Sequence, residues 1–275
     1  MFLHSPPASS ADWDQVASKP RPSWYLDRLV ARQKRQVHQE LVRRWAGAGF
    51  SGAVLKTDLF EEAHGEDQIL FDLYPDALTL GIDVSWQTAK NARRRSSHPR
   101  AHFAGADVRH LALREASVDL VVSTSTLDHF DTKEELRQAL AEIARVLRPG
   151  GVAVITLDNA QNPLYWLLRW ASRRGWAPYR LGETARLAEL VDLLQDAGMR
   201  VDATDWLLHN PRVISTSVFL LLRRVLGRHA DVPIRGLLTV FSWLAKLPTR
   251  RYTACFVAAR GEKAAADPSL SARRG

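Results

Sequence analysis

The chain has 275 residues, 46% of them hydrophobic and 25% charged, which is the composition of packed proteins and excludes intrinsic disorder. Its single cysteine, Cys255, excludes an intrachain disulfide and a cysteine-ligated zinc or iron–sulfur site, and it indicates the reducing cytoplasm. The net charge of +8 comes mostly from scattered arginines rather than from one dense basic tract, so the charge does not favour a nucleic acid as partner.

The two ends of the chain differ in character from its middle. Residues 1–22 are rich in Pro, Ser and Ala and have neither an apolar period nor the basic and apolar regions of a secretory signal. We expect a flexible segment at 1–22, a domain over 23–263 and a disordered tail at 264–275. The apolar runs that end at Arg223 and Lys246 are shorter than the roughly 20 residues of a bilayer span, so we expect no transmembrane segment.

Periodicity predicts the elements of the first half of the domain. From Trp24 an apolar stripe at helical spacing predicts a helix that stops at Gly47. Short apolar runs then alternate with helical stretches. Strands are expected at 53–59, 78–83, 102–106, 118–124 and 152–157, and helices at 68–74, 86–95 and 133–147. This alternation predicts a parallel sheet with helices on both faces.

The helix expected at 133–147 has clear boundaries. Asp131 or Thr132 can cap its first turn, and Glu134 and Glu135 are available for a capping box. The sequence Arg-Pro-Gly-Gly at 148–151 ends it, because proline and glycine stop a helix and turn the chain into the next strand.

The second half of the domain mixes helices with two further strands. Helical segments are expected at 163–176, 184–197, 213–226 and 234–247, and strands at 199–205 and 252–259. The predicted fold is therefore α/β: a Rossmann-like, doubly wound, seven-stranded sheet, mostly parallel with an antiparallel last strand. Helices cover both faces, and insertions near 160–182 and 207–250 form a helical cap.

Three aspartates follow successive strands of this sheet. Asp58 ends the first strand, Asp83 ends the second and Asp107 follows the third. A doubly wound sheet binds its ligand beyond the carboxyl ends of the strands, so these carboxylates are expected to converge. Asp83 has the position and chemistry to accept both hydroxyls of an adenosine ribose. Its alternative role is to cap the next helix together with Ser85.

The sequence FAGADVRHLALREASVDLVVSTSTLDHF, followed by EIARVLRPGGVAVITLDN, resembles the class I S-adenosylmethionine-dependent methyltransferases over roughly residues 52–159. The resemblance implies S-adenosyl-L-methionine as cofactor, with Asp83 on the ribose and Asp107 and Val108 on the adenine. It places residues 127–130 between the cofactor and the acceptor. The cofactor-binding residues implied in this way, with the first-loop residues described next, are Asp58, Gly65, Asp83, Val84, Asp107, Val108, Ser123 and Leu127.

The first loop departs from the family pattern. The family carries an acidic residue followed by a glycine-rich loop, whereas this chain reads VLKTDLFEEAHGED, with Gly65 as the one glycine. Asp58 can stand for the acid near the cofactor ammonium, but Phe60 and Glu62 fall where small residues are expected. Two interpretations stay open: a longer loop that closes on Gly65, or a Rossmann-like binding protein that has lost its cofactor.

Other chemistries lack their motifs. The chain has no Tyr-x-x-x-Lys pair, no P-loop glycine pattern and no Gly-x-Ser-x-Gly elbow, and no dehydrogenase glycine pattern follows a predicted strand. Its nine histidines lie on different predicted loops and strands and form no pair on one face of a predicted helix, so no metal site is expected.

His129 is the candidate general base, because it follows the fourth strand and can take a proton from a hydroxyl or amine acceptor. A supporting or helix-capping role is the alternative. The cap segments are rich in Trp and Leu, which favours a small apolar or aromatic acceptor, and a lipid-borne molecule is one form of such an acceptor. Arg223, Arg224, Arg228 and Arg235 beside leucine-rich helices allow a weak peripheral contact with a membrane, unless they are simply solvated arginines on core helices.

Overall fold

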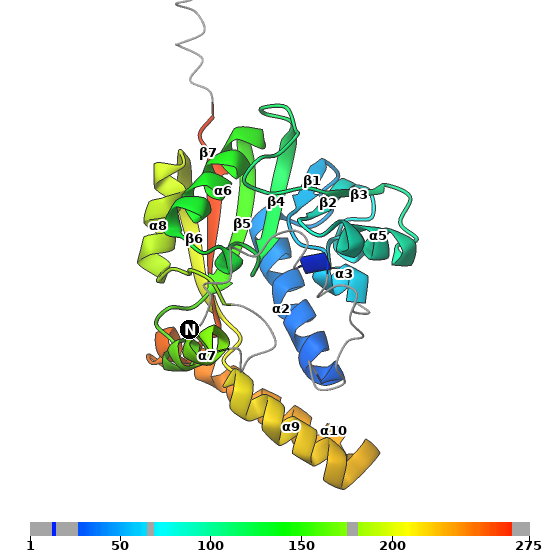
Figure 1. Ribbon diagram of the computed structural model, residues 1–275, viewed down its shortest axis with the longest axis vertical. Coiled ribbons are helices and arrows are strands. Elements are labelled where there is room, and N and C mark those ends of the chain that lie inside the picture. Colours follow the sequence, from blue (N-terminus) through cyan, green and yellow to red (C-terminus); the bar gives the residue numbers. More distant parts are fainter. Residues whose placement is uncertain (1–12, 15–26, 65–68, 175–180, 266–275) are drawn as a thin grey trace, which may run out of the picture.

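The computed structural model describes residues 13–14, 27–64, 69–174 and 181–265 (Figure 1). These residues form one seven-stranded sheet in the order β3-β2-β1-β4-β5-β7-β6. Its strands are β1 (Ala53–Lys56), β2 (Leu78–Asp83), β3 (Ala101–Gly105), β4 (Val118–Thr124), β5 (Leu147–Asp158), β6 (Met199–Leu207) and β7 (Phe256–Lys263). Pairing is parallel from β3 to β5, and β7 runs antiparallel to both β5 and β6. The predicted fold class is confirmed.

Helices cover both faces of this sheet. They are α2 (Arg28–Ala46), α3 (Phe60–His64), α4 (Ile69–Leu73), α5 (Trp86–Arg95), α6 (Lys133–Val146), α7 (Pro163–Arg173), α8 (Leu187–Asp196), α9 (Arg212–Leu226), α10 (Asp231–Trp243) and α11 (Arg250–Thr253). Short 3-10 turns lie at Leu127–His129, Gly227–Ala230 and Leu244–Lys246. The helix at 133 begins as predicted, since Thr132 and Glu135 form a reciprocal capping box.

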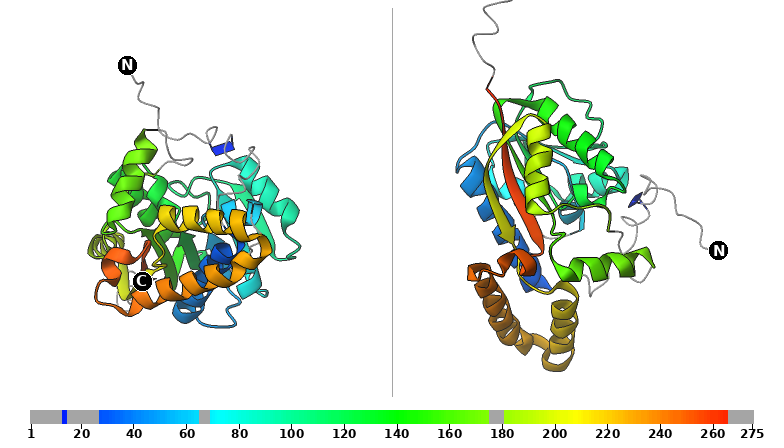
Figure 2. Two further views of the ribbon diagram at one scale, coloured as in Figure 1. Left: turned by 90° about the horizontal axis from the view of Figure 1, so that it is seen from below. Right: turned by 90° about the vertical axis from the view of Figure 1, so that its left-hand side faces the viewer.

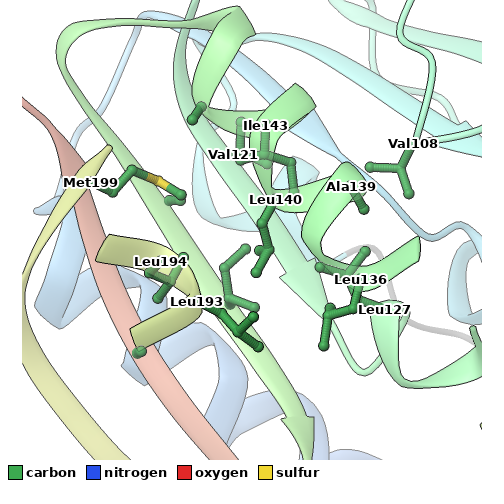
Figure 3. Packing of buried hydrophobic residues seen from close by; sticks show 14 of the residues in the cluster. Val108, Val121, Leu127, Leu136, Ala139, Leu140, Ile143, Leu193, Leu194 and Met199 are labelled. Carbon is green, nitrogen blue, oxygen red and sulfur yellow. The ribbon is translucent and has the colours of Figure 1, made fainter. Parts of the chain in front are cut away.

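Two apolar layers hold the helices to the sheet. On one face α6 packs against β5 and α8 against β6 and β7, with Leu136, Leu140, Ile143 and Leu194 fully buried (Figure 3). On the other face α2 and α4 contribute Leu41, Val42, Leu70 and Tyr74 to a second layer. Fully burying such side chains stabilises the fold by about 1.5–3 kcal/mol each, which makes these layers the main source of stability.

Three of the predicted boundaries are wrong, and in each case a neighbouring helix or a paired strand sets the observed boundary. The first strand ends at Lys56 rather than residue 59, because α3 starts at Phe60. The fifth strand starts at Leu147, since pairing with Val118 extends it through the Pro-Gly-Gly sequence expected to be a turn. Residues 250–253 form α11 rather than strand, and β7 instead runs on to Lys263, where it pairs with β6.

The helical segments of the cap lie at the carboxyl end of the parallel strands. Helix α7 follows β5, and the α9–α10 hairpin follows β6 and projects from the body of the molecule (Figure 1). No helix in the described part of the chain has both the length and the apolar character needed to cross a bilayer. The segments expected to be flexible or disordered, 1–22 and 264–275, lie outside the described residues except for 13–14 and 264–265.

Candidate active site

Asp83 is the point at which three loops meet. Its carboxylate oxygens accept hydrogen bonds from the backbone N–H of Ser85 at 2.9 Å and of Leu59 at 3.2 Å. Its backbone carbonyl accepts from the N–H of Ala106 at 2.9 Å. The loops after β1, β2 and β3 therefore meet at one residue, two at its side chain and one at its backbone. The alternative capping role belongs to Ser85, whose hydroxyl accepts from the N–H of Thr88 at 3.0 Å.

The environment of Asp83 favours its protonated form. Burial and the nearby Asp58 carboxylate raise the pKa of Asp83 to about 7. Each of its oxygens accepts one backbone N–H, and a carboxylate has further lone pairs to offer. Asp83 can therefore still receive the hydroxyls of a bound sugar.

The loop after β1 turns directly into α3. Asp58 caps this helix, because its carboxylate accepts from the N–H of Phe60 at 2.9 Å. The fully buried Leu59 covers Gly81, where any side chain would collide with it: a Cβ on Gly81 would lie 2.4 Å from the Leu59 side chain. A bulky residue of the first loop thus packs tightly against β2. Gly65 lies outside the described residues.

A buried ion pair lies beneath this loop. Lys56, the last residue of β1, and Glu62 of α3 are each 1% exposed, and the Lys56 Nζ atom lies 3.0 Å from a Glu62 carboxylate oxygen. Burial alone would lower the pKa of Lys56, but the carboxylates of Glu62 and Asp58 raise it. The pair ties β1 to α3 across the turn that lacks the glycines. We did not predict it, although a lysine within a buried strand is a signal that a partner must exist.

Asp107 and Val108 follow β3 beside the Asp83 loop. Val108 is buried, and the Asp107 carboxylate holds the Arg109 guanidinium at 2.6 and 3.0 Å. Partial burial would raise the pKa of Asp107, but these hydrogen bonds from Arg109 lower it. Arg109 also pairs with Glu135 of α6. Asp107 is therefore ionised and oriented at the edge where an adenine amino group is expected.

The remaining residues of the predicted cofactor set occupy different environments. Val84 is 36% exposed beside Asp83. Ser123, in β4, is fully buried and its hydroxyl has no hydrogen-bond partner among the described residues. Leu127 packs in the core with Leu136 rather than at the surface (Figure 3).

Two residues near the start of the chain lie across this edge. The Asp14 carboxylate accepts from the Ser85 hydroxyl and, at 3.1 Å, from the N–H of Gln87. The Trp13 ring meets the His129 ring edge to face, with 5.2 Å between centroids. These residues therefore connect the loop after β2 with the loop after β4. The sequence contains no signal for this contact, because residues 1–22 lack an apolar period.

Beside His129 lies a buried acidic cluster that we did not predict. Asp128 is 2% exposed, and its carboxylate accepts from the N–H of Asp158 at 2.7 Å and from the Ser125 hydroxyl at 3.1 Å. Burial and the neighbouring Asp158 charge raise the pKa of Asp128 to about 6. Asp158, at the end of β5, forms an ion pair with Arg212 at the start of α9. The cluster joins the ends of β4 and β5 to the cap.

A close backbone approach completes the acceptor side. Gly182 donates its N–H to the Asp128 carbonyl at 3.0 Å, and a Cβ at this position would lie 2.1 Å from the Phe130 carbonyl oxygen. Tyr165 of α7 donates its hydroxyl hydrogen to the Gly182 carbonyl at 2.9 Å. Only glycine permits this approach, which ties α7 to the loop that carries His129.

Comparisons with known proteins agree with this arrangement. Residues 65–155 match the methyltransferase domain family. A probable S-adenosylmethionine-dependent methyltransferase of Mycolicibacterium smegmatis is 30% identical over 180 residues, which cover 65% of this chain and 62% of that relative. A malonyl-[acyl-carrier protein] O-methyltransferase of Geobacter sulfurreducens is 38% identical over 89 residues, 32% of each chain. The chain thus spans less than two thirds of the length of these relatives.

The fold has a counterpart among solved structures. The geranyl diphosphate C-methyltransferase of Streptomyces coelicolor A3(2), solved with S-adenosyl-L-homocysteine, aligns with a TM-score of 0.56 at 12% identity, covering 90% of this chain and 87% of that one. At this identity the likeness concerns the fold. The match at 65–155, the relatives and this fold together support assignment of the chain to the class I methyltransferases, whose cofactor is S-adenosyl-L-methionine.

Proposed function

We propose that this protein transfers a methyl group from S-adenosyl-L-methionine to a small acceptor. The observation that carries the proposal is the meeting of three loops at Asp83, at the carboxyl edge of a doubly wound sheet. Carboxyl edges of this kind bind nucleotide cofactors, and a carboxylate suits the vicinal hydroxyls of a ribose.

The residues present fit the adenosine half of the cofactor. Asp83 keeps lone pairs for the ribose, and the oriented Asp107 carboxylate can accept from the adenine amino group. Val84, which is partly exposed, and the buried Val108 each follow one of these aspartates along the chain. For the methionine half we propose the N-terminal turn of α3 and Asp58 in place of the usual glycine loop. The buried Lys56–Glu62 pair holds that turn in position.

In such a reaction the protein mainly has to hold the acceptor and the methyl group in the right positions. The bound cofactor supplies a methyl group that its sulfonium already makes electrophilic, so the chain needs no covalent nucleophile. The Asp128–Asp158–Arg212 cluster fixes the loop after β4, and Gly182 and Tyr165 fix α7 against it. Holding the acceptor in line with the methyl group accounts for most of the acceleration expected of such a site.

We propose His129 as the base that takes the proton from a hydroxyl or amine acceptor. His129→Ala is expected to lower methyl transfer by about 100-fold at neutral pH, the usual contribution of a general base, and to leave cofactor affinity within about twofold. Turnover across pH and titration with S-adenosylhomocysteine measure the two quantities. Unchanged turnover of the variant at every pH would exclude this role and leave His129 as a partner of Trp13.

The acceptor that we propose is small and apolar or aromatic. The cap segments near 160–182 and 207–250 reach the acceptor edge, and Tyr165 and Leu168 of α7 lie buried there with Leu181. A lipid-borne molecule is one form of such an acceptor, and a weak peripheral contact with a membrane would suit it. We also propose a cytoplasmic location, because reducing compartments suit the free, buried Cys255.

Titration with S-adenosylhomocysteine tests the proposed function directly. We expect saturable binding to the full chain, measured by isothermal calorimetry, together with a rise in melting temperature as ligand is added. A folded protein that shows neither heat nor stabilisation would instead be a Rossmann-like binding protein without cofactor. The bulky Leu59 and the missing glycines would then be the reason.

A further inference from the structure

The α9–α10 hairpin is a fixed projection of the fold. Phe219, Ile234 and Leu238 are buried between its helices and Leu29 at the start of α2. Figures 1 and 2 show the hairpin extending beyond the end of the sheet, with α2 as its neighbour. Arg223 lies 2.6 Å from Asp27, and Arg28 lies 2.7 Å from Asp231. These contacts hold the hairpin to the body at its inner face.

The face of α9 turned away from this core carries an apolar stripe. Its members follow helical spacing and are 37–70% exposed: Ile214, Val218, Leu221 and Val225. On α10, Val232, Val240 and Trp243 are 60–78% exposed. We call these seven side chains the docking surface. Leaving a contiguous apolar stripe in water is costly, and such patches on helices are typical of interaction sites.

The charge around the docking surface has one sign. Residues 211–251 contain eight Arg and Lys and one Asp, a net charge of +7 out of +8 for the whole chain. The one acid, Asp231, already pairs with Arg28 and Arg223. Arg224, Arg228, Arg235 and Lys246 are exposed beside the apolar side chains. The natural counterpart of this surface is therefore anionic.

An anionic bilayer complements both the positive charge and the exposed apolar side chains of this surface. A second copy of the chain does not. Two copies joined through this hairpin would bring two strongly basic surfaces together, with no acid left to compensate them. A membrane surface offers negative headgroups for the arginines and a boundary layer for the apolar stripe. Trp243 suits that boundary, where tryptophan rings are enriched. Exposed Trp166 and Trp170 of α7 add two more such rings at the same end of the molecule.

We propose that the docking surface binds the face of an anionic lipid bilayer, and that it does so beside the acceptor side of the site. Arg212, the first residue of α9, forms an ion pair with the buried Asp158 at the end of β5, which fixes the base of the hairpin to that side. The hairpin thus brings the acceptor edge to a lipid surface. This inference deepens the proposed function, since a membrane-bound acceptor matters only to a transferase.

Flotation of the full chain with vesicles tests the docking surface. We expect binding to vesicles of mixed phosphatidylcholine and phosphatidylglycerol, weakened by salt, and little binding to phosphatidylcholine alone. The double variant Leu221→Asp/Val225→Asp is expected to lower the bound fraction at least about tenfold. Arg224→Glu is expected to weaken binding by at least about fivefold. Leu78→Asp, at an apolar position that is 51% exposed at the opposite edge of the sheet, is the matched control and should bind as the parent does.

Other measurements on the same proteins separate the two proposals. All variants should bind S-adenosylhomocysteine like the parent, which also shows that they are folded. A parent chain that binds the cofactor product but not anionic vesicles would overturn the docking surface alone. So would a dimer that the double variant dissociates, or salt-sensitive binding to RNA in the absence of vesicle binding. A parent that binds vesicles but not S-adenosylhomocysteine would overturn the proposed function and leave the docking surface standing.

Discussion

Replacing Asp83 with alanine is expected to weaken the binding of S-adenosylhomocysteine by about 100-fold or more. The change removes the proposed acceptor of two ribose hydrogen bonds and leaves the N–H groups of Leu59 and Ser85 without this partner. Hydrogen bonds to a charged group contribute about 1.5–3 kcal/mol each, and two of them account for a loss of this size. Isothermal calorimetry on the parent and the variant measures it.

Asp119→Ala is the matched control for this substitution. Asp119 also accepts a backbone N–H, that of Ala53 at 2.7 Å, and pairs with Arg148, but it lies at the opposite edge of the sheet. Its removal should cost stability and leave cofactor affinity unchanged. Equal losses of affinity in both variants would mean that Asp83 acts only through the fold.

The pH dependence of binding provides a second check on Asp83. Its pKa of about 7 implies that the carboxylate, the better acceptor, forms as pH rises from 6 to 8. Affinity for S-adenosylhomocysteine should therefore rise roughly tenfold over that interval in the parent and stay flat in Asp83→Asn. The same shift has the opposite sign for stability: the folded state holds the proton more tightly, so this group's contribution declines as pH rises from about 4 to 7. A flat parent profile would contradict the assignment.

Breaking the Lys56–Glu62 pair is expected to have the largest effect on stability. Lys56→Met leaves the Glu62 carboxylate buried without a partner, and losing one member of a buried pair costs about 3–5 kcal/mol of unfolding free energy. Urea denaturation measures this change. The double variant Lys56→Met/Glu62→Leu should recover much of the loss, because it removes both buried charges.

Lys133→Met is the control for Lys56→Met. Lys133 and its partner Glu189 are 30% and 44% exposed, and exposed pairs contribute about 0–1 kcal/mol. If Lys56→Met costs no more than Lys133→Met, the pair beneath the cofactor loop is not a structural support. The double variant would then give no recovery.

The sequence predicted most accurately those helix and strand bounds that are set by residues close by in the chain. The bounds of β2, α5 and β4 agree with prediction, because Ser85 caps α5 and each strand is a run of apolar residues between polar ones. The predicted bounds are wrong where an element ends through pairing with a strand that is distant in the sequence. β5 begins early because Leu147 pairs with Val118, and β7 extends late because Lys263 pairs with Met199.

In the candidate site, too, some residues could be predicted from the sequence, whereas others are brought together only by the fold. Asp83 could be identified from its place at a strand end, since parallel strands bring their carboxyl ends to one edge. The Asp128–Asp158–Arg212 cluster could not, because its members lie 30 and 54 positions apart and meet only through the cap. The contact of Trp13 with His129 spans more than a hundred positions and left no local signal.

The sequence by itself determined the alternation of strands and helices, the carboxylate after the second strand and the excess of positive charge. These depend on local periodicity and on composition, which need no partner. Only the tertiary structure decided that Lys56 is buried against Glu62, that Leu59 packs against Gly81 and that one apolar face of α9 is exposed. Burial is a property of the packed chain, because each of these side chains is enclosed or exposed by residues far from it in the sequence.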